Sequence, residues 1–354
     1  MRRGLMEWDS QELPVAVLDA RIARLRGVMK SAGLDAFIVY TNLVRPSAVT
    51  HLTGFTPYWS EGLLLVPMTG RLVFATALSN RVADWIRSTN PVSEVTSTPK
   101  PGAMLGERLA KDTAVKRVGV LELDAMPSEL SDHLAVAAPA VEWIDGSALF
   151  ATLRRDVDAV EQAMLARADA LAVGALDQVN ATTNSDAGAL AGLVEKNARL
   201  AGAEEAYIAI APDLAADRRF NRISKPAPLS DRFAVRASVA YKGSWVRRTR
   251  TFAADDATRR ADVWFDNLIR KIGAEQSFAE QLAFHVRVLP NATLESWMAE
   301  SCTGSYPLSV IASSRSSANS APVEGSFLVL TVELLLDSGP WIGSAPLIVG
   351  KSSL

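Results

Sequence analysis

Two arginines, Arg236 and Arg247, are the residues whose type and spacing most directly indicate chemistry. They belong to residues 232–252, where apolar and polar residues alternate with the period of a half-buried β-strand. A lysine–glycine pair in the middle of this stretch favours a tight turn, because glycine adopts positive φ without strain. If Tyr241 pairs with Ser244 across this turn, both arginines project from the same face of a hairpin.

Two interpretations of the arginine pair follow from the residues alone. Like charges that are neighbours on paired strands repel each other unless an anionic group lies between them. The pair is therefore either a solvated basic face or the cationic part of a site that contains an anion.

The shape of the hairpin resembles the metal-binding hairpin of the creatinase, prolidase and aminopeptidase P family, the "pita-bread" proteins. In that family Asp-x-Gly is followed by Tyr-x-Gly-Tyr and then by Asp-x-Thr-Arg-Thr-Phe, and the two aspartates bind a pair of metal ions. Residues 249–252 supply Thr-Arg-Thr-Phe here. The resemblance then places Arg236 and Arg247 at the two aspartate positions and Ser238 at the glycine.

The remaining ligand positions of the family also differ in this sequence. The family's ligand histidine would fall in residues 301–304, where Cys302 or its neighbour stands instead. Glu333, in Leu-Thr-Val-Glu, matches the first of two ligand glutamates, whereas the second falls near Ser344 or Ala345. Divalent metals need several N, O or S donors in fixed geometry, so we expect neither a bound metal nor another cofactor.

A buried Glu333 without a metal would require another cation. Arg236 or Arg247 could supply it as a bidentate partner. The cluster is then either a structural replacement for the metals, or one arginine stays unpaired and binds the carboxylate of a small ligand. The other binding candidates on the hairpin are Ser238, Tyr241 and Trp245.

Candidates for acid–base and nucleophilic chemistry are few. Creatinase is a metal-free member of the family, but it relies on a histidine just before the hairpin, and residues 219–228 contain none. Acid–base catalysis would fall to Glu333, Asp231, Tyr241 or Cys302.

Two further residues are weaker candidates. Cys302 has no partner visible in the sequence except His285, so an inert buried thiol is favoured. His51 is expected to be a structural histidine, although the resemblance implies dimers in which loops of this region reach the neighbouring subunit's cleft.

The elements around these residues predict two domains. Residues 1–150 alternate helices and strands, with Gly-Leu-Asp-Ala and Leu-Thr-Gly-Phe segments similar to those of the creatinase N-terminal domain, and predict an α/β domain. Residues 151–354 follow the duplicated helix, strand and hairpin order that the resemblance implies for an α+β pita-bread domain. Within it, a helix over 258–272 is expected to bury Val263 and Leu268.

The composition indicates in which compartment the protein is found and which classes of partner it binds. The chain of 354 residues is 49% apolar and 21% charged, with a net charge of −2, which gives no reason to expect nucleic acid or an anionic membrane as partner. A single cysteine excludes an internal disulfide and fits a reducing cytosol. No signal peptide and no apolar stretch of membrane-spanning length is visible. We expect a cytoplasmic protein, and the resemblance implies a homodimer.

The expected function is that of a metal-free, degenerate family member that binds a small anionic ligand or acts as a partner subunit. The alternative is a metal-independent, creatinase-like hydrolase of a C–N bond in a small molecule. A conventional Xaa-Pro aminopeptidase comes third.

Overall fold

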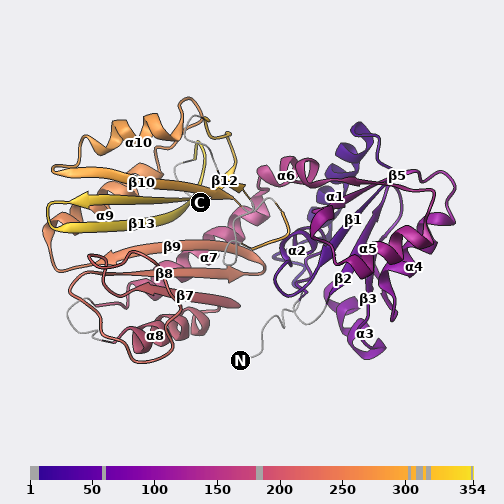
Figure 1. Cartoon of the computed structure of the whole chain (residues 1–354), viewed down its shortest axis with the longest axis horizontal. Helices are drawn as coiled ribbons and strands as arrows, with labels where there is room; N and C mark the ends of the chain where they lie inside the picture. Colours follow the sequence, from indigo (N-terminus) through magenta and orange to yellow (C-terminus); the bar gives the residue numbers. More distant parts are fainter. Residues whose placement is uncertain are drawn as a thin grey trace. The chain divides into compact units, whose positions relative to one another are not determined.

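The computed structural model describes residues 8–57, 61–180, 186–301, 304–307, 314–315, 320–351 and 354. The chain divides into two compact units, Met1–Arg155 with Cys302–Ser313, and Asp156–Ser301 with Ser314–Leu354. Figure 1 shows helices packed on a β-sheet in each unit. Within the described ranges, no helix combines the length and the apolar character needed to cross a membrane.

The amino-terminal unit is built on a six-stranded sheet in the order β4-β3-β2-β1-β5-β6. Its strand β1 (Ala36–Thr41) is buried along its whole length, and it pairs antiparallel with β2 (Gly62–Pro67) and parallel with β5 (Arg117–Leu121). The other elements are α1 (Val15–Ser31), α2 (Ser47–Thr53), β3 (Leu72–Thr76), α3 (Asn80–Thr89), β4 (Ser93–Ser97), α4 (Pro101–Ala110), η1 (Leu123–Ala125), α5 (Ser128–Ala137), β6 (Glu142–Asp145) and α6 (Ser147–Arg155). The predicted α/β arrangement is confirmed, and the predicted domain division at residue 150 falls within α6.

A segment distant in sequence also belongs to the amino-terminal unit. The backbone N–H of Ser305 donates to Glu122 Oε1 at 3.1 Å, and that of Ser47 donates to the Ser305 carbonyl at 3.1 Å. The Arg45 guanidinium lies 4.6 Å from the centre of the Tyr306 ring and donates to its hydroxyl at 3.0 Å. These contacts attach residues 304–307 to the end of β5 and to the start of α2.

The carboxy-terminal unit is built on a seven-stranded sheet in the order β11-β10-β12-β13-β9-β8-β7. Its strands are β7 (Glu205–Ala211), β8 (Phe233–Tyr241), β9 (Ser244–Phe252), β10 (Ala292–Ser301), β11 (Ser314–Arg315), β12 (Phe327–Leu336) and β13 (Gly339–Ile348). Its helices are α7 (Ala159–Leu176), α8 (Ala187–Leu200), α9 (Asp256–Ile269) and α10 (Phe278–Val286).

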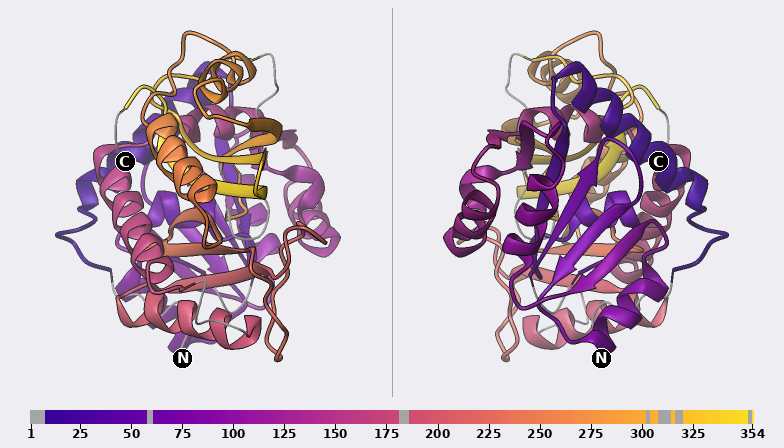
Figure 2. Two further views of the ribbon diagram at one scale, coloured as in Figure 1. Left: turned by 90° about the vertical axis from the view of Figure 1, so that its left-hand side faces the viewer. Right: turned by 90° about the vertical axis from the view of Figure 1, so that its right-hand side faces the viewer.

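The two faces of this sheet differ in chemistry. One face carries apolar side chains of β8 such as Val235, which pack on α7 and α8, and apolar side chains of β12 such as Leu330, which pack with α9 and α10. Figure 2 shows these helices along one side of the strands. The opposite face, which we call the polar face, receives the alternate residues of the same strands, among them Arg236 and Thr331.

The hairpin that carries the two arginines forms as the sequence predicts. Strands β8 and β9 pair in the register that joins Tyr241 to Ser244, and Arg247 lies opposite Ser238. Lys242 and Gly243 both have positive φ, 45° and 76°, as in the turns that match the twist of two-residue hairpins. Arg236 and Arg247 therefore share the polar face.

Two features of this unit were not predicted correctly. Strand β10, which lies next to the short edge strand β11, was missed because only its Ala299 and Glu300 are buried and it lacks the apolar alternation that marks a strand. The expectation that α9 buries Val263 is wrong, since this side chain is 63% exposed while Leu268 is buried.

Candidate functional site

A row of polar side chains crosses the polar face of the carboxy-terminal sheet. Arg236 of β8 pairs with Thr249 of β9, Thr249 with Ser344 of β13, and Ser344 with Thr331 of β12. Residues that pair directly in an antiparallel sheet project to the same side, so these four side chains form one line. We call this line the central row.

The hydroxyl groups of the central row are buried and only partly hydrogen-bonded. Ser344 Oγ donates to Thr249 Oγ1 at 2.6 Å. Thr331 is 5% exposed, and its Oγ1 has no hydrogen-bond partner among the residues that the structure describes. A buried hydroxyl without a partner is unfavourable by about 1–3 kcal/mol, so Thr331 favours a ligand or water that completes it.

Arg236 is a half-buried cation that has no carboxylate partner within the described parts of the chain. Its guanidinium carbon lies 3.9 Å from the centre of the Phe220 ring, and its Nε donates to Thr249 Oγ1 at 3.5 Å. Burial, followed by the charge of Arg247, lowers the pKa of Arg236 to about 10. The charged form of Arg236 is therefore disfavoured by its surroundings, and an anion bound next to it would be stabilised by this positive charge.

Arg247 has a carboxylate partner, and it is not the one expected. Its Nη1 lies 2.7 Å from Glu300 Oε2, in a pair of which Glu300 is only 3% exposed. Glu333, which the sequence offered as a partner for either arginine, is therefore not the carboxylate in contact with Arg247. Glu300 was missed together with strand β10. It lies two residues before Cys302, next to the segment where the resemblance places a metal ligand, and this position is the signal that could have identified it.

Glu333 lies on the same face but in a more open position than expected. Its side chain is 31% exposed, and its nearest cation is Arg218, at 3.7 Å. Arg218 also pairs with Glu295, whose hydrogen bond is the main cause that raises the pKa of Arg218. Glu333 therefore belongs to a partly solvated ion-pair group beside the central row.

The other hairpin candidates divide between the two faces. Trp245 lies on the polar face and stacks on Tyr207 with ring centres 5.6 Å apart, and the Arg222 guanidinium lies 5.0 Å from the centre of the same tyrosine ring. Ser238 is buried opposite Arg247. Tyr241 packs instead against the core under α7 and α8, so it does not face Arg236.

Two further candidates lie outside both the hairpin and β12. His51 is buried in α2 of the amino-terminal unit, where its Nδ1 lies 2.8 Å from Arg154 Nη1 and its carbonyl accepts from Arg21 at 3.0 Å. These contacts are those of a structural histidine. Cys302 lies outside the described residues.

The donor set of the polar face does not suit a pair of divalent metal ions. Among the described residues no group of three or more His, Cys, Asp and Glu side chains is arranged to hold a metal. The described residues of this face include two guanidinium groups, three hydroxyls and the carboxylates of Glu300 and Glu333, which are already paired with Arg247 and Arg218. Guanidinium groups repel metal ions and supply no lone pair.

Comparisons with known proteins support the fold. Residues 21–155 match the family model of the Creatinase/Prolidase N-terminal domain. No curated protein sequence matches the chain.

Solved structures match the chain over nearly its whole length. An X-Pro aminopeptidase from Thermotoga maritima MSB8 is 14% identical with a TM-score of 0.72, covering 94% of this chain and 95% of that one. An Xaa-Pro dipeptidase from Bacillus anthracis is 16% identical with a TM-score of 0.67, covering 95% and 96%. The N-terminal domain of the FACT complex subunit SPT16 from Cicer arietinum is 14% identical with a TM-score of 0.64, covering 96% and 95%. The predicted creatinase/aminopeptidase fold is confirmed.

Proposed function

We propose that the chain is a metal-free relative of the creatinases and prolidases that binds a small carboxylate ligand. Residues 21–155 match their N-terminal domain, and the chain shares the fold of Xaa-Pro peptidases over nearly its whole length. The ligand lies on the polar face of the carboxy-terminal unit. Fold alone does not decide the activity, since the same fold occurs in peptidases and in a subunit of the FACT complex.

The observation that carries the proposal is the state of Arg236. It is half-buried and next to a second arginine, and among the described residues it forms no direct ion pair, although the more distant charges of Glu300 and Glu333 act on it. A planar guanidinium offers two parallel N–H donors that match a carboxylate. A bound carboxylate would remove the repulsion between Arg236 and Arg247, which gives the ligand a favourable electrostatic contribution.

The central row supports a second contact for the same ligand. Three interstrand spacings separate Arg236 from Thr331, about 14 Å across the sheet. The buried Thr331 hydroxyl lacks a partner among the described residues. A ligand long enough to span the row would contact both ends, whereas a smaller carboxylate would contact Arg236 alone and leave Thr331 to water.

The creatinase-like hydrolase has less support on this face. Glu333 is engaged with Arg218, and Tyr241 points into the core on the other side of the sheet. Among the acid–base candidates of the hairpin and of β12, none lies next to Arg236 without a charged partner.

We also infer a cytoplasmic homodimer, as the family resemblance and the single cysteine suggest. The net charge of −2 gives no support for a nucleic-acid partner. A role as the partner subunit of an active relative is compatible with ligand binding at Arg236.

The test combines ligand binding with metal content. Succinate and guanidinoacetate, which both carry a carboxylate, are titrated by calorimetry and by thermal shift into the parent protein and into Arg236→Ala. We expect at least one of them to raise the melting temperature, and we expect Arg236→Ala to weaken its binding by about tenfold or more, which corresponds to about 1.4 kcal/mol.

The matched control is Arg81→Ala, which removes an exposed arginine of α3. Equal binding by the parent and Arg236→Ala would contradict the proposal. So would two equivalents of manganese, cobalt or zinc in elemental mass spectrometry of the purified protein. Turnover of creatine that is lost in Glu333→Gln would favour the hydrolase.

A further inference from the structure

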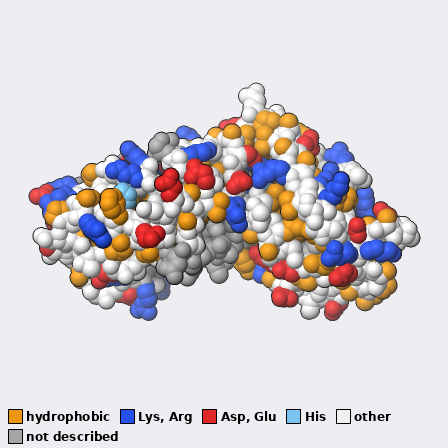
Figure 3. Space-filling view, turned by 90° about the horizontal axis from the view of Figure 1, so that it is seen from above, with side chains coloured by type: hydrophobic (Ala, Val, Ile, Leu, Met, Phe, Trp, Pro, Cys, Tyr) orange, Lys and Arg blue, Asp and Glu red, His pale blue; other side chains and the backbone are white. Residues whose placement is uncertain are grey.

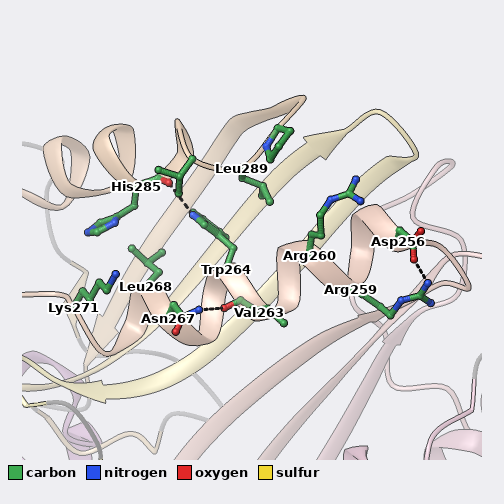
Figure 4. Close-up of a pocket in the computed structure, with 12 residues that line it drawn as sticks. Asp256, Arg259, Arg260, Val263, Trp264, Asn267, Leu268, Lys271, His285 and Leu289 are labelled. Atoms are coloured by element: carbon green, nitrogen blue, oxygen red, sulfur yellow. Dashed lines mark hydrogen bonds and ion pairs between the residues drawn. The ribbon is translucent and has the colours of Figure 1, made fainter.

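A groove on the carboxy-terminal unit lies between α9 and the chain that connects α10 to β10. Its volume is about 720 Å³; residues of α9 and Lys271 line one side, and His285, Val288, Leu289 and Pro290 line the other. Figure 4 shows the α9 side chains along the groove, with Trp264 at its centre. The groove lies on the helix side of the sheet, so it is distinct from the polar face.

The floor of the groove is apolar, and the indole N–H within it already has a hydrogen-bond acceptor in the protein. Trp264, Leu268 and Leu289 are at most 7% exposed and belong to the core of this unit. Trp264 Nε1 donates to the His285 carbonyl at 2.9 Å, so its polar atom is already paired. A ligand would therefore meet a rigid apolar surface.

The rim of the groove exposes large apolar side chains. Val263 is 63% exposed and Val288 is 72% exposed, on opposite sides of the floor. Phe284, in the neighbouring helix α10, is also 63% exposed. Figure 3 shows hydrophobic and basic side chains interspersed on this unit, at the left. Adjacent exposed apolar side chains framed by polar groups mark interaction surfaces.

The charge of the rim is positive. Arg259, Arg260 and Lys271 line the groove, against the single carboxylate of Asp256. Arg259 pairs with Asp256, whereas Arg260 and Lys271 have no ion pair within the part of the chain that is described. The charge of Lys271, after burial, also lowers the pKa of His285. The uncompensated cations stand at opposite ends of the groove, and the complementary occupant is acidic.

The shape and the charge together select among occupants. The rise of an α-helix places Arg260 and Ile269, the last residue of α9, about 14 Å apart along the axis, and Lys271 follows two residues beyond that end. A second copy in a two-fold arrangement would place the same basic rim against itself, so self-association is disfavoured. A small amphiphile would reach one cation but not both.

We propose that this groove binds an acidic amphipathic helix of a partner protein. The apolar stripe of the helix lies on Trp264 between Val263 and Val288, and carboxylates near its two ends pair with Arg260 and Lys271. This is the helix-in-groove mode, in which anchors at helical spacing give affinity and charges at the rim set orientation and association rate. The proposal does not depend on ligand binding at Arg236.

The probe is a fluorescein-labelled helical peptide of about 16 residues, with leucines along one face and glutamates at both ends. Fluorescence anisotropy against the full-length parent should show saturable binding that weakens as salt is added. We expect Val263→Glu, and separately Lys271→Glu, to weaken binding by about tenfold or more. Val288→Glu serves as a second groove variant, and both valines are exposed, so the fold should tolerate the changes.

The matched control is Val136→Glu, which adds the same charge at a valine of α5 that is 81% exposed in the amino-terminal unit. The Val136→Glu protein should bind the peptide as tightly as the parent does. A peptide in which the leucines are scrambled should not bind the parent. Absence of saturable binding, or equal affinity for the parent and the groove variants, would overturn the proposal. Complete displacement of the peptide by decanoate at similar affinity would reassign the groove to small amphiphiles, and loss of self-association in Val263→Glu would reassign it to a second copy.

Discussion

Arg236 and Arg247 are neighbouring cations that differ in their ion pairs. Glu300 neutralises Arg247 at 2.7 Å, and Arg236 is left to the Phe220 ring and a threonine hydroxyl. A buried ion pair contributes little net stability compared with apolar residues, but removal of one partner leaves an uncompensated charge in a dry environment. This asymmetry leads to a clear expectation for Glu300.

Glu300→Gln should lower the free energy of unfolding by about 3 kcal/mol, because Arg247 would lose its anion while it remains beside Arg236. Urea denaturation followed by circular dichroism measures the change. The control is Glu142→Gln, which breaks the exposed pair with Arg117, whose side chains are 44% and 65% exposed, and which should cost less than about 1 kcal/mol. Similar losses in both variants would mean that the Arg247–Glu300 pair is not specially buried.

The β8–β9 hairpin is the element that brings both arginines to one face. Its turn requires positive φ at Lys242 and Gly243, and the carboxylate of Glu204 accepts from the Gly243 backbone N–H at 3.4 Å. The turn therefore combines a backbone constraint with a buried ionisable group. Each gives a separate prediction.

Gly243→Ala should destabilise the carboxy-terminal unit by about 1 kcal/mol, because φ at this position is 76° and a Cβ disfavours that region. Gly192→Ala is the matched control. Gly192 lies inside α8, and a Cβ there would meet nothing within 4 Å, so this change should stabilise by up to about 1 kcal/mol. Thermal unfolding of the two variants should shift in opposite directions.

Glu204 should make stability depend on pH. Burial raises its pKa from 4.5 to about 7, despite hydrogen bonds from the turn that oppose the shift. The folded state then binds more protons than the unfolded state between about pH 4.5 and 7, so the contribution of Glu204 to the free energy of unfolding falls as pH rises through this window.

Glu204→Gln should remove this fall and make the protein about 1–3 kcal/mol more stable than the parent at pH 8, with a smaller difference at pH 5. Melting curves at a series of pH values test this. The same substitution at the exposed Glu107 of α4 is the control and should leave the parent's pH profile unchanged. A difference between parent and Glu204→Gln that does not vary with pH would show that the carboxyl does not titrate in this range.

The sequence allowed much of the molecule to be predicted where local chemistry determined structure. The hairpin register followed from alternation and a glycine turn, and the fold followed from the resemblance carried by Thr-Arg-Thr-Phe and the amino-terminal segments. The partner of Arg247 could not be predicted, because two strands, β12 and β13, separate the strands of Glu300 and Arg247, in pairings that no local pattern encodes. The exposure of Val263 was missed for a similar reason, since helical periodicity identifies an apolar side chain but not what covers it.

The attachment of residues 304–307 to the amino-terminal unit affects how this protein can be divided. The chain leaves that unit after Arg155, returns for Cys302–Ser313 and leaves again. An expressed fragment that stops at Arg155 would lack the Ser305 contacts with Glu122 and Ser47. A single cut after Arg155 therefore does not separate the two units, because the amino-terminal unit takes its last segment from within the later part of the sequence.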